Sequence, residues 1–197
     1  MNEKYINRPI YTEKVQPFIG KQLIKIFTGQ RRVGKSYIML QLMDTIKKQY
    51  PNANIIYIDK ELLSFSEVKD SASLYDYVSS RLTSGPDFLF IDEVQEIDGF
   101  QLCLRSLLNE NKCDIYCTGS NAKMLSGELA THLGGRYIEI PIHSLSYREF
   151  LNFNSLSDSD SSLNLYLTLG GMPYLHNLAL NQDVTYEYLR NVYSTIL

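Results

Sequence analysis

One eight-residue stretch constrains the fold of this chain more than any other. Residues 29–36 read GQRRVGKS and fit the pattern G-x-x-x-x-G-K-[ST] at every position. A short apolar, β-prone run, 23–27, precedes them, and a run with the apolar spacing of a helix follows. A strand, a glycine-containing loop and a helix in this order form the setting in which the pattern binds the phosphates of a nucleotide.

The residues of this loop have separate expected roles. Two glycines let the backbone bend so that several N–H groups, together with the positive end of the following helix, meet phosphate oxygens. Lys35 would reach the β- and γ-phosphates, and the hydroxyl of Ser36 would bind Mg²⁺. A glycine turn with a chance lysine is the competing interpretation, but it leaves the complete pattern and its flanks unexplained. The residues expected to hold the nucleotide are Gly29, Gln30, Arg31, Arg32, Val33, Gly34, Lys35 and Ser36.

Length and composition exclude several classes of protein. A chain of 197 residues, 44% of them apolar, suffices for one α/β domain and an appendage. No apolar run approaches about 18 residues, so we expect no membrane span. The first residues lack the apolar core of a signal peptide, which predicts a cytoplasmic protein. A formal charge of −3 gives no overall footprint for nucleic acid, although a local patch or a part outside this sequence could still contact DNA.

Alternating β-prone and helical runs predict a three-layer α/β sandwich with a parallel five-stranded sheet. The expected strands are 23–27, 54–59, 88–91, 115–118 and 137–140. The expected helices of this part are 12–18, 38–46, 74–82, 100–109 and 124–133.

The remaining sequence predicts a small helical lid region. Residues 152–162 are rich in Ser, Asn and Asp, which is typical of a flexible connector. We therefore divide the chain into a core, 1–151, a linker, 152–162, and a helical lid or the start of a C-terminal domain, 163–197. The last helical run has no cap, glycine or proline at its end, so we expect a longer polypeptide to continue from it.

Two carboxylates follow the third expected strand and form a second nucleotide-site signature. Asp92 ends the apolar run 88–91, where it is placed to hold the Mg²⁺ shell. Glu93 would then be the general base that activates the attacking water. A strand followed by an acidic turn is the alternative, helped by further acids at positions 96 and 98.

Two further residues are candidates for catalysis. Ser120 follows the fourth strand, where a hydroxyl could sense the γ-phosphate, although helix capping by Asn121 competes for this segment. Arg136 stands between a helix end and the fifth strand, from which a guanidinium could reach a phosphate bound by a neighbouring subunit. A surface salt bridge is the alternative for Arg136. The guanine-recognition pattern NKxD at 111–114 follows a helix where it should follow a strand, so we reject GTP specificity.

With these residues identified, the chain resembles the AAA-plus superfamily of P-loop ATPases. More narrowly, it is similar to a prokaryotic group with a GxRRxGKS loop, a strand ending in Asp-Glu, then TGS, GRYIEI, LSYREF-like and GGMP segments. Here these occupy 29–36, 92–93, 118–120, 135–140, 145–150 and 170–173.

The resemblance carries implications for fold and site. It implies the strand order 5-1-4-3-2, ATP with Mg²⁺ as cofactors, and a C-terminal domain beyond this sequence. It also implies that Pro173 lies against the adenine, and it makes Arg190 the candidate for a lid arginine. ATP and ADP are the expected ligands and a homo-oligomer is one candidate assembly, while the sequence leaves a protein or DNA partner unknown.

Three functions remain in competition. The first is an ATPase that converts hydrolysis into conformational change on a partner or in a nucleic-acid process. The second is a nucleotide-gated interaction switch with slow turnover, and the third is a small-molecule kinase. Glu93 favours the first two, because a kinase needs an acceptor pocket and no residue that activates water.

Overall fold

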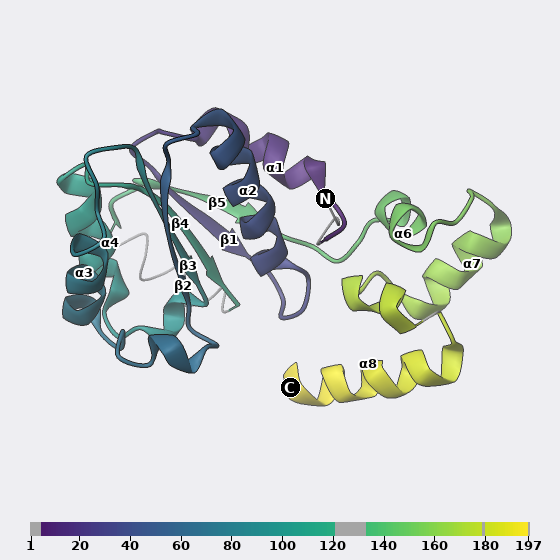
Figure 1. Ribbon diagram of the computed structural model, residues 1–197. Helices are drawn as coiled ribbons and strands as arrows, with labels where there is room; N and C mark the ends of the chain where they lie inside the picture. Colours follow the sequence, from purple (N-terminus) through teal and green to yellow (C-terminus); the bar gives the residue numbers. More distant parts are fainter. Residues whose placement is uncertain (1–4, 121–132, 179, 197) are drawn as a thin grey trace. The chain divides into compact units, whose positions relative to one another are not determined.

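A five-stranded parallel sheet forms the centre of the N-terminal part of the chain (Figure 1). The structure is a computed structural model that describes residues 5–120, 133–178 and 180–196. The strands run in the order β2-β3-β4-β1-β5, which confirms the order implied by the resemblance. They are β1 (Ile24–Thr28), β2 (Asn54–Asp59), β3 (Asp87–Asp92), β4 (Asp114–Gly119) and β5 (Tyr137–Pro141).

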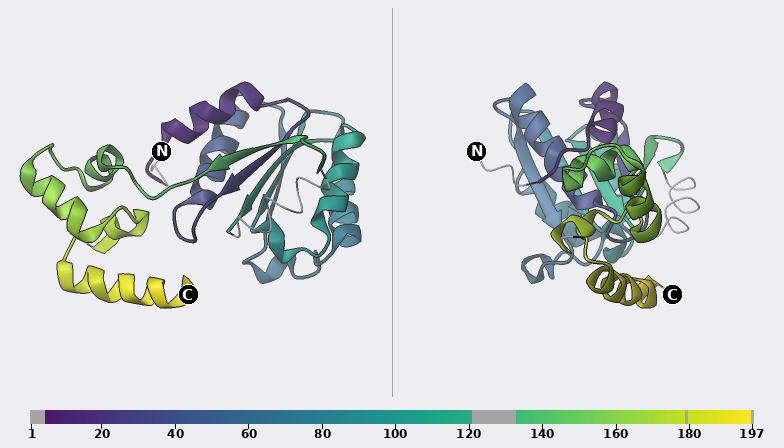
Figure 2. Two further views of the ribbon diagram at one scale, coloured as in Figure 1. Left: turned by 180° about the vertical axis from the view of Figure 1, so that it is seen from behind. Right: turned by 90° about the vertical axis from the view of Figure 1, so that its right-hand side faces the viewer.

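Helices cover both faces of the sheet, with α1 and α2 on one side and α3 and α4 on the other (Figures 1 and 2). The helix expected over 12–18 begins earlier, at a proline suited to the first turn, and continues as a 3₁₀ turn. The helix expected over 124–133 lies almost wholly outside the described residues. The bounds are α1 (Pro9–Val15), η1 (Gln16–Phe18), α2 (Lys35–Gln49), η2 (Leu63–Phe65), α3 (Ser71–Ser79), η3 (Val94–Glu96) and α4 (Phe100–Asn109).

The central strands are buried along their whole length because both of their faces are covered. β1 and β3 are buried at every residue. Ile24 and Ile26 belong to the main core cluster, together with residues of α3 and α4. On the opposite face, the rings of Phe90 and Tyr116 stack with their centroids 4.5 Å apart. The sheet is therefore held from both sides, and its carboxyl edge is left for the loops that carry the candidate site.

A second compact unit consists of the chain from Ile142 onward, together with the loop segment Gln30–Gly34 and the residues up to Ile6. Of the segment expected to be a flexible connector, residues 152–154 and 160–162 are helical and residues 155–159 lie between the two helices. Ser159 accepts a hydrogen bond from the backbone N–H of Ser162 at 3.2 Å and caps the next helix. Serine, asparagine and aspartate favour helix caps as well as loops, so the composition of this segment fits both. The elements are α6 (Tyr147–Asn154), α7 (Asp160–Leu169), η4 (Pro173–Leu178) and α8 (Gln182–Ile196).

A close backbone approach fixes the turn that precedes η4. The N–H of Leu145 donates to the carbonyl oxygen of Gly171 at 2.6 Å. A Cβ atom added at Gly171 would lie 2.3 Å from the carbonyl oxygen of Leu145, so only glycine fits. Among the described residues, no helix is long and apolar enough to cross a membrane.

Candidate functional site

The phosphate-loop sequence lies between the last residue of β1, Thr28, and the first residue of α2, Lys35, as its pattern requires. Three of its residues have positive φ, with 140° at Gly29, 67° at Arg32 and 94° at Gly34. At Gly34 the absence of a side chain makes this conformation accessible, whereas at Arg32 it costs free energy. The loop therefore bends as a phosphate cradle must.

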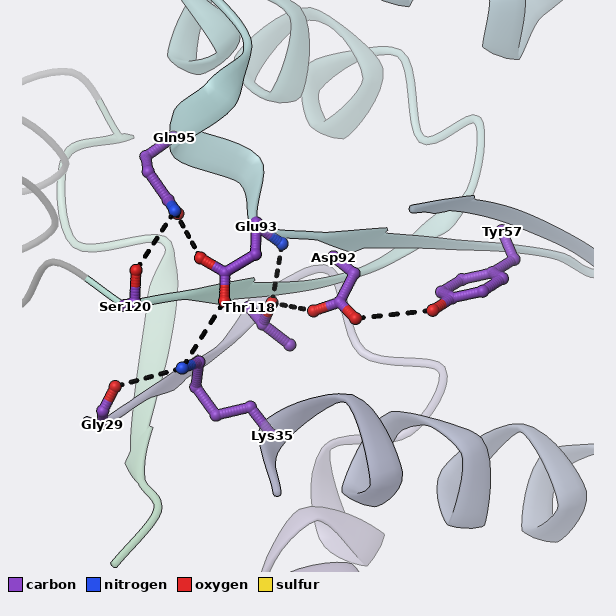
Figure 3. A network of polar contacts seen from close by, with 8 residues as sticks. All are labelled: Gly29, Lys35, Tyr57, Asp92, Glu93, Gln95, Thr118 and Ser120. Atoms are coloured by element: carbon purple, nitrogen blue, oxygen red, sulfur yellow. Dashed lines mark hydrogen bonds and ion pairs between the residues drawn. The ribbon is translucent and has the colours of Figure 1, made fainter. Parts of the chain in front are cut away.

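Lys35 is buried and its ammonium group has two described contacts (Figure 3). Nζ donates to the carbonyl oxygen of Gly29 at 3.2 Å, across the loop. Nζ also lies 3.6 Å from Oε1 of Glu93, which follows β3. The structure thus brings together the lysine of the first motif and the second carboxylate of the other, although they are far apart in the sequence.

Asp92 ends β3 and is almost completely buried, with 3% of its surface exposed. Its carboxylate accepts hydrogen bonds from the hydroxyls of Thr118 and Ser36, and from the hydroxyl of Tyr57 at 3.4 Å. Burial raises the pKa of Asp92, while the hydrogen bonds from Ser36 and Thr118 oppose that shift. The two predicted metal ligands, Asp92 and Ser36, are therefore in direct contact.

This donor set fits Mg²⁺. The ion prefers oxygen ligands, keeps several waters, and is often held by only one or two protein groups together with substrate phosphates. A carboxylate and a hydroxyl in contact meet that need. No cluster of three or more His, Cys, Asp or Glu side chains suited to an all-protein metal cage occurs within the described ranges.

Glu93 has a strained backbone and a well-held carboxylate. Its φ and ψ are 53° and 56°, the left-handed region, and its N–H donates to Oγ1 of Thr118 at 2.8 Å. Burial would raise the pKa of Glu93, but the hydrogen bond from Gln95 and the charge of Lys35 outweigh it, so the pKa lies below its usual value. The side chain is therefore an ionised carboxylate at neutral pH, as a general base must be.

Ser120 belongs to the same cluster, because its hydroxyl forms a hydrogen bond with the Glu93 carboxylate and also contacts Gln95, which the sequence did not predict. The side-chain Nε2 of Gln95 donates to Oγ of Ser120 at 3.3 Å and also to Oε2 of Glu93 (Figure 3). The signal that could have identified Gln95 is its place two residues after Glu93, in a turn that leaves the strand. Thr118 also has a larger part than expected, since its hydroxyl contacts both Asp92 and the backbone of Glu93. Asn121 lies outside the described residues.

Arg136 lies at the amino ends of the strands, opposite the carboxyl ends that carry Asp92 and Glu93. It immediately precedes β5, whose Tyr137 pairs with Ile24 at the start of β1. Arg136 therefore lies opposite residue 23, six residues before Gly29, and at about 3.3 Å per residue it is about 20 Å from that first residue of the phosphate loop. The Arg136 side chain is exposed and donates to the amide oxygen of Asn109, so its described partner is not the acid that a salt bridge would need.

The second compact unit places Pro173 beside the loop segment that belongs to the same unit. A Cβ atom built on Gly34 would lie 4.0 Å from Cγ of Pro173. The guanidinium of Arg32 lies over the ring of Tyr188, 5.7 Å from its centroid. This unit also contains an open pocket of about 760 Å³. The residues that line it include Gln30, Met172, Tyr186, Leu189, Arg190 and Tyr193.

Comparison with known proteins gives a consistent picture. Residues 21–151 match the AAA domain family. A protein of Haemophilus influenzae is 36% identical over 88% of this chain, and one of Methanocaldococcus jannaschii is 29% identical over 96%. The chain spans less than half the length of these relatives, 45% and 44% respectively.

Solved structures agree on the fold. The chain is similar to AMPPCP-bound DnaA from Aquifex aeolicus, with a TM-score of 0.60 and 16% identity over 89% of this chain and 62% of that one. It is also similar to the Aeropyrum pernix ORC1 protein in complex with DNA, with a TM-score of 0.54 and 9% identity over 75% of this chain and 48% of that one. The matched family, the strand order and the two joined sequence motifs lead to one conclusion: the chain belongs to the AAA domain family and has the P-loop NTPase fold.

Proposed function

We propose that this chain binds ATP with Mg²⁺ and hydrolyses it to drive conformational change on a protein partner or in a nucleic-acid process. One observation carries the proposal. Lys35 and Glu93, from two separate motifs, lie 3.6 Å apart beside the contact between Ser36 and Asp92. These are the parts that phosphate binding, metal binding and water activation require.

Each residue has a stated task in this proposal. The backbone of residues 29–34 and the ammonium of Lys35 hold the phosphates, while Ser36 and Asp92 hold Mg²⁺. Bound Mg²⁺ would neutralise charge that develops on the phosphate oxygens. Glu93 accepts a proton from the attacking water, and Ser120 senses the γ-phosphate. Pro173, beside Gly34, is proposed to lie against the adenine.

A slow nucleotide-gated switch is the second candidate, and one observation favours it. The carboxylate of Glu93 contacts both Lys35 and Gln95 in this structure. Lys35 must turn from Glu93 toward the phosphates before the carboxylate can act on water, and a barrier at that step would slow turnover. Measured turnover distinguishes the two candidates.

The test of nucleotide binding is Lys35→Ala, titrated with ATP and Mg²⁺ by calorimetry. Removing a charge-assisted phosphate contact should cost about 1.5 to 3 kcal/mol, or roughly 10- to 150-fold in affinity. Lys47→Ala is the matched control, because Lys47 is an exposed lysine of the same helix, α2. Equal affinities for wild type and Lys35→Ala would contradict the role given to Lys35.

A further inference from the structure

Gln95 is held in place by the backbone on both sides of it. The left-handed backbone of Glu93 turns the chain out of β3 and directly into the single 3₁₀ turn η3. Val94, which precedes Gln95, is fully buried, and Ile97, two residues after Gln95, is 1% exposed. The turn is therefore anchored in the core on both sides of Gln95. The side chain of Gln95 is thus presented from a fixed turn rather than from a mobile loop.

The contacts of the Gln95 amide fix its orientation. A carboxylate can only accept hydrogen bonds when ionised, so the NH₂ group must face Glu93. Nε2 contacts Oε2 of Glu93 and Oγ of Ser120, the latter at 3.3 Å. Oε1 of Gln95 is enclosed and has no hydrogen-bond partner within the described part of the chain. Among the described residues, the Gln95 amide is therefore satisfied only at the end that faces Glu93 and Ser120.

The two oxygens of the Glu93 carboxylate are thereby distinguished. Oε2 is held by Gln95, while Oε1 lies 3.6 Å from Nζ of Lys35. A hydrogen bond to one oxygen prevents the carboxylate from rotating freely, so the other oxygen keeps its direction toward the lysine (Figure 3). In the proposed function the phosphates bind on that side.

We propose that Gln95 is a positioning residue for hydrolysis, which holds Oε2 of the Glu93 carboxylate and so keeps Oε1 toward the attacking water. This inference rests on the proposed function. A general base must lie within hydrogen-bond reach of the proton that it accepts, and a misplacement of about 1 Å can cost about 10²-fold in rate. Gln95 acts through Glu93 and does not itself hold the nucleotide.

The first experiment compares steady-state hydrolysis by the whole chain with that of Gln95→Met, which keeps the side-chain length but has no donor. The expected result is a 10- to 100-fold fall in kcat, with KM and the Kd for ATP within twofold of wild type. Gln49→Met, a change of an exposed glutamine in α2, is the control. Gln95→Glu, which keeps the shape but cannot donate, should show the same fall and serves if Gln95→Met does not fold. An unchanged kcat in a folded variant overturns the inference.

A double mutant separates positioning from a general structural effect. Because Gln95 acts through Glu93, adding Gln95→Met to Glu93→Gln should change kcat by less than about twofold. If the two losses multiply, Gln95 acts independently of Glu93, and the inference is overturned.

A third measurement does not depend on hydrolysis. The side-chain amide signals of Gln95 are assigned in the NMR spectrum by their loss in Gln95→Met. They should be protected from exchange in wild type, and Glu93→Ala should remove that protection while Glu96→Ala leaves it. Unchanged protection in Glu93→Ala overturns the pairing. A chain that binds ATP and shows the protected amide but does not hydrolyse ATP overturns the proposed function, and with it the catalytic use of the pair. Hydrolysis with a normal kcat in Gln95→Met overturns the inference alone.

Discussion

Two buried lysines pair with carboxylates at opposite ends of the strands of the sheet. Lys25 lies in β1, and Lys35 lies directly after the loop that follows β1. Lys25 pairs with Asp114 at the amino edge, near the start of β1 and at the first residue of β4. Lys35 pairs with Glu93 at the carboxyl edge. The lysine side chains are about equally hidden, with 0% and 4% exposed. The two pairs nevertheless differ in the separation of the lysine from its carboxylate and in the exposure of the carboxylate.

The amino-edge pair is closed. Nζ of Lys25 contacts Asp114 and donates to the carbonyl oxygen of Lys21 at 3.0 Å. The other carboxylate oxygen of Asp114 accepts from the N–H of Gly20 at 2.8 Å and from the hydroxyl of Tyr116 at 2.7 Å. Burial lowers the pKa of Lys25, and the charge of Asp114 opposes that shift.

The carboxyl-edge pair is open by comparison. Its ions are 3.6 Å apart, and 13% of the Glu93 side chain is exposed. The difference teaches that burial of a charge does not by itself indicate function. We expect the fold to depend on the pair of Lys25 and Asp114, whereas in the proposed function Lys35 exchanges its 3.6 Å contact with Glu93 for the phosphates.

The largest effect is expected from Lys25→Met, which should lower the free energy of unfolding by about 3 to 5 kcal/mol because Asp114 is left buried without its cation. Nucleotide affinity of the folded protein should not change. Denaturant unfolding measures the first quantity and calorimetry the second. Lys35→Ala should show the reverse, with lost affinity and a smaller loss of stability. Comparable destabilisation by the two changes would break the distinction between closed and open pairs.

Arg136→Ala tests whether the amino edge also serves a neighbouring subunit. An arginine supplied across an interface can be worth about 10³-fold in rate, or about 4 kcal/mol, with little effect on binding by one subunit. The variant should bind ATP normally, fail to hydrolyse it, and recover activity when mixed with Lys35→Ala subunits.

Arg105→Ala, which removes an exposed arginine of α4, is the control for Arg136→Ala. Full activity of Arg136→Ala alone would mean that Arg136 is a surface residue without a part in hydrolysis. Inactivity without rescue would place its effect within its own subunit.

Glu93→Gln tests whether Glu93 is the general base at the carboxyl ends of the strands. It should reduce kcat by about 10²-fold or more, near 2.7 kcal/mol, while ATP affinity is retained, because a general base acts on the transition state more than on the bound substrate. Glu96→Gln changes an exposed glutamate of the same turn and should behave as wild type. Equal turnover by Glu93→Gln and wild type would mean that another residue is the base.

The sheet could be predicted because each strand is a nearly continuous apolar run, a pattern imposed by cover on both faces. The loop at 29–36 and the run ending at Asp92 could be predicted because their residue types are required in contiguous order. The strand order came from the family resemblance, since local runs do not encode which strands lie side by side.

Other features could not be predicted for identifiable reasons. The helical segments on either side of Ser155 were missed because capping residues and loop residues have the same composition. Gln95 was missed because its position depends on the left-handed backbone of Glu93. A left-handed backbone can be predicted from a glycine, but not from a glutamate. Arg136 could be placed in sequence order, but its distance from the phosphate loop follows only from strand register.

At position 93 the left-handed backbone lowers the stability of the fold, whereas the carboxylate is needed for the proposed chemistry. Glycine would adopt the same φ and ψ without strain, and asparagine with less, so either residue would suit a chain selected for stability alone. Neither can take a proton from water as a carboxylate does. In the proposed function, the glutamate at position 93 therefore gives up some stability for a carboxylate that accepts a proton from water.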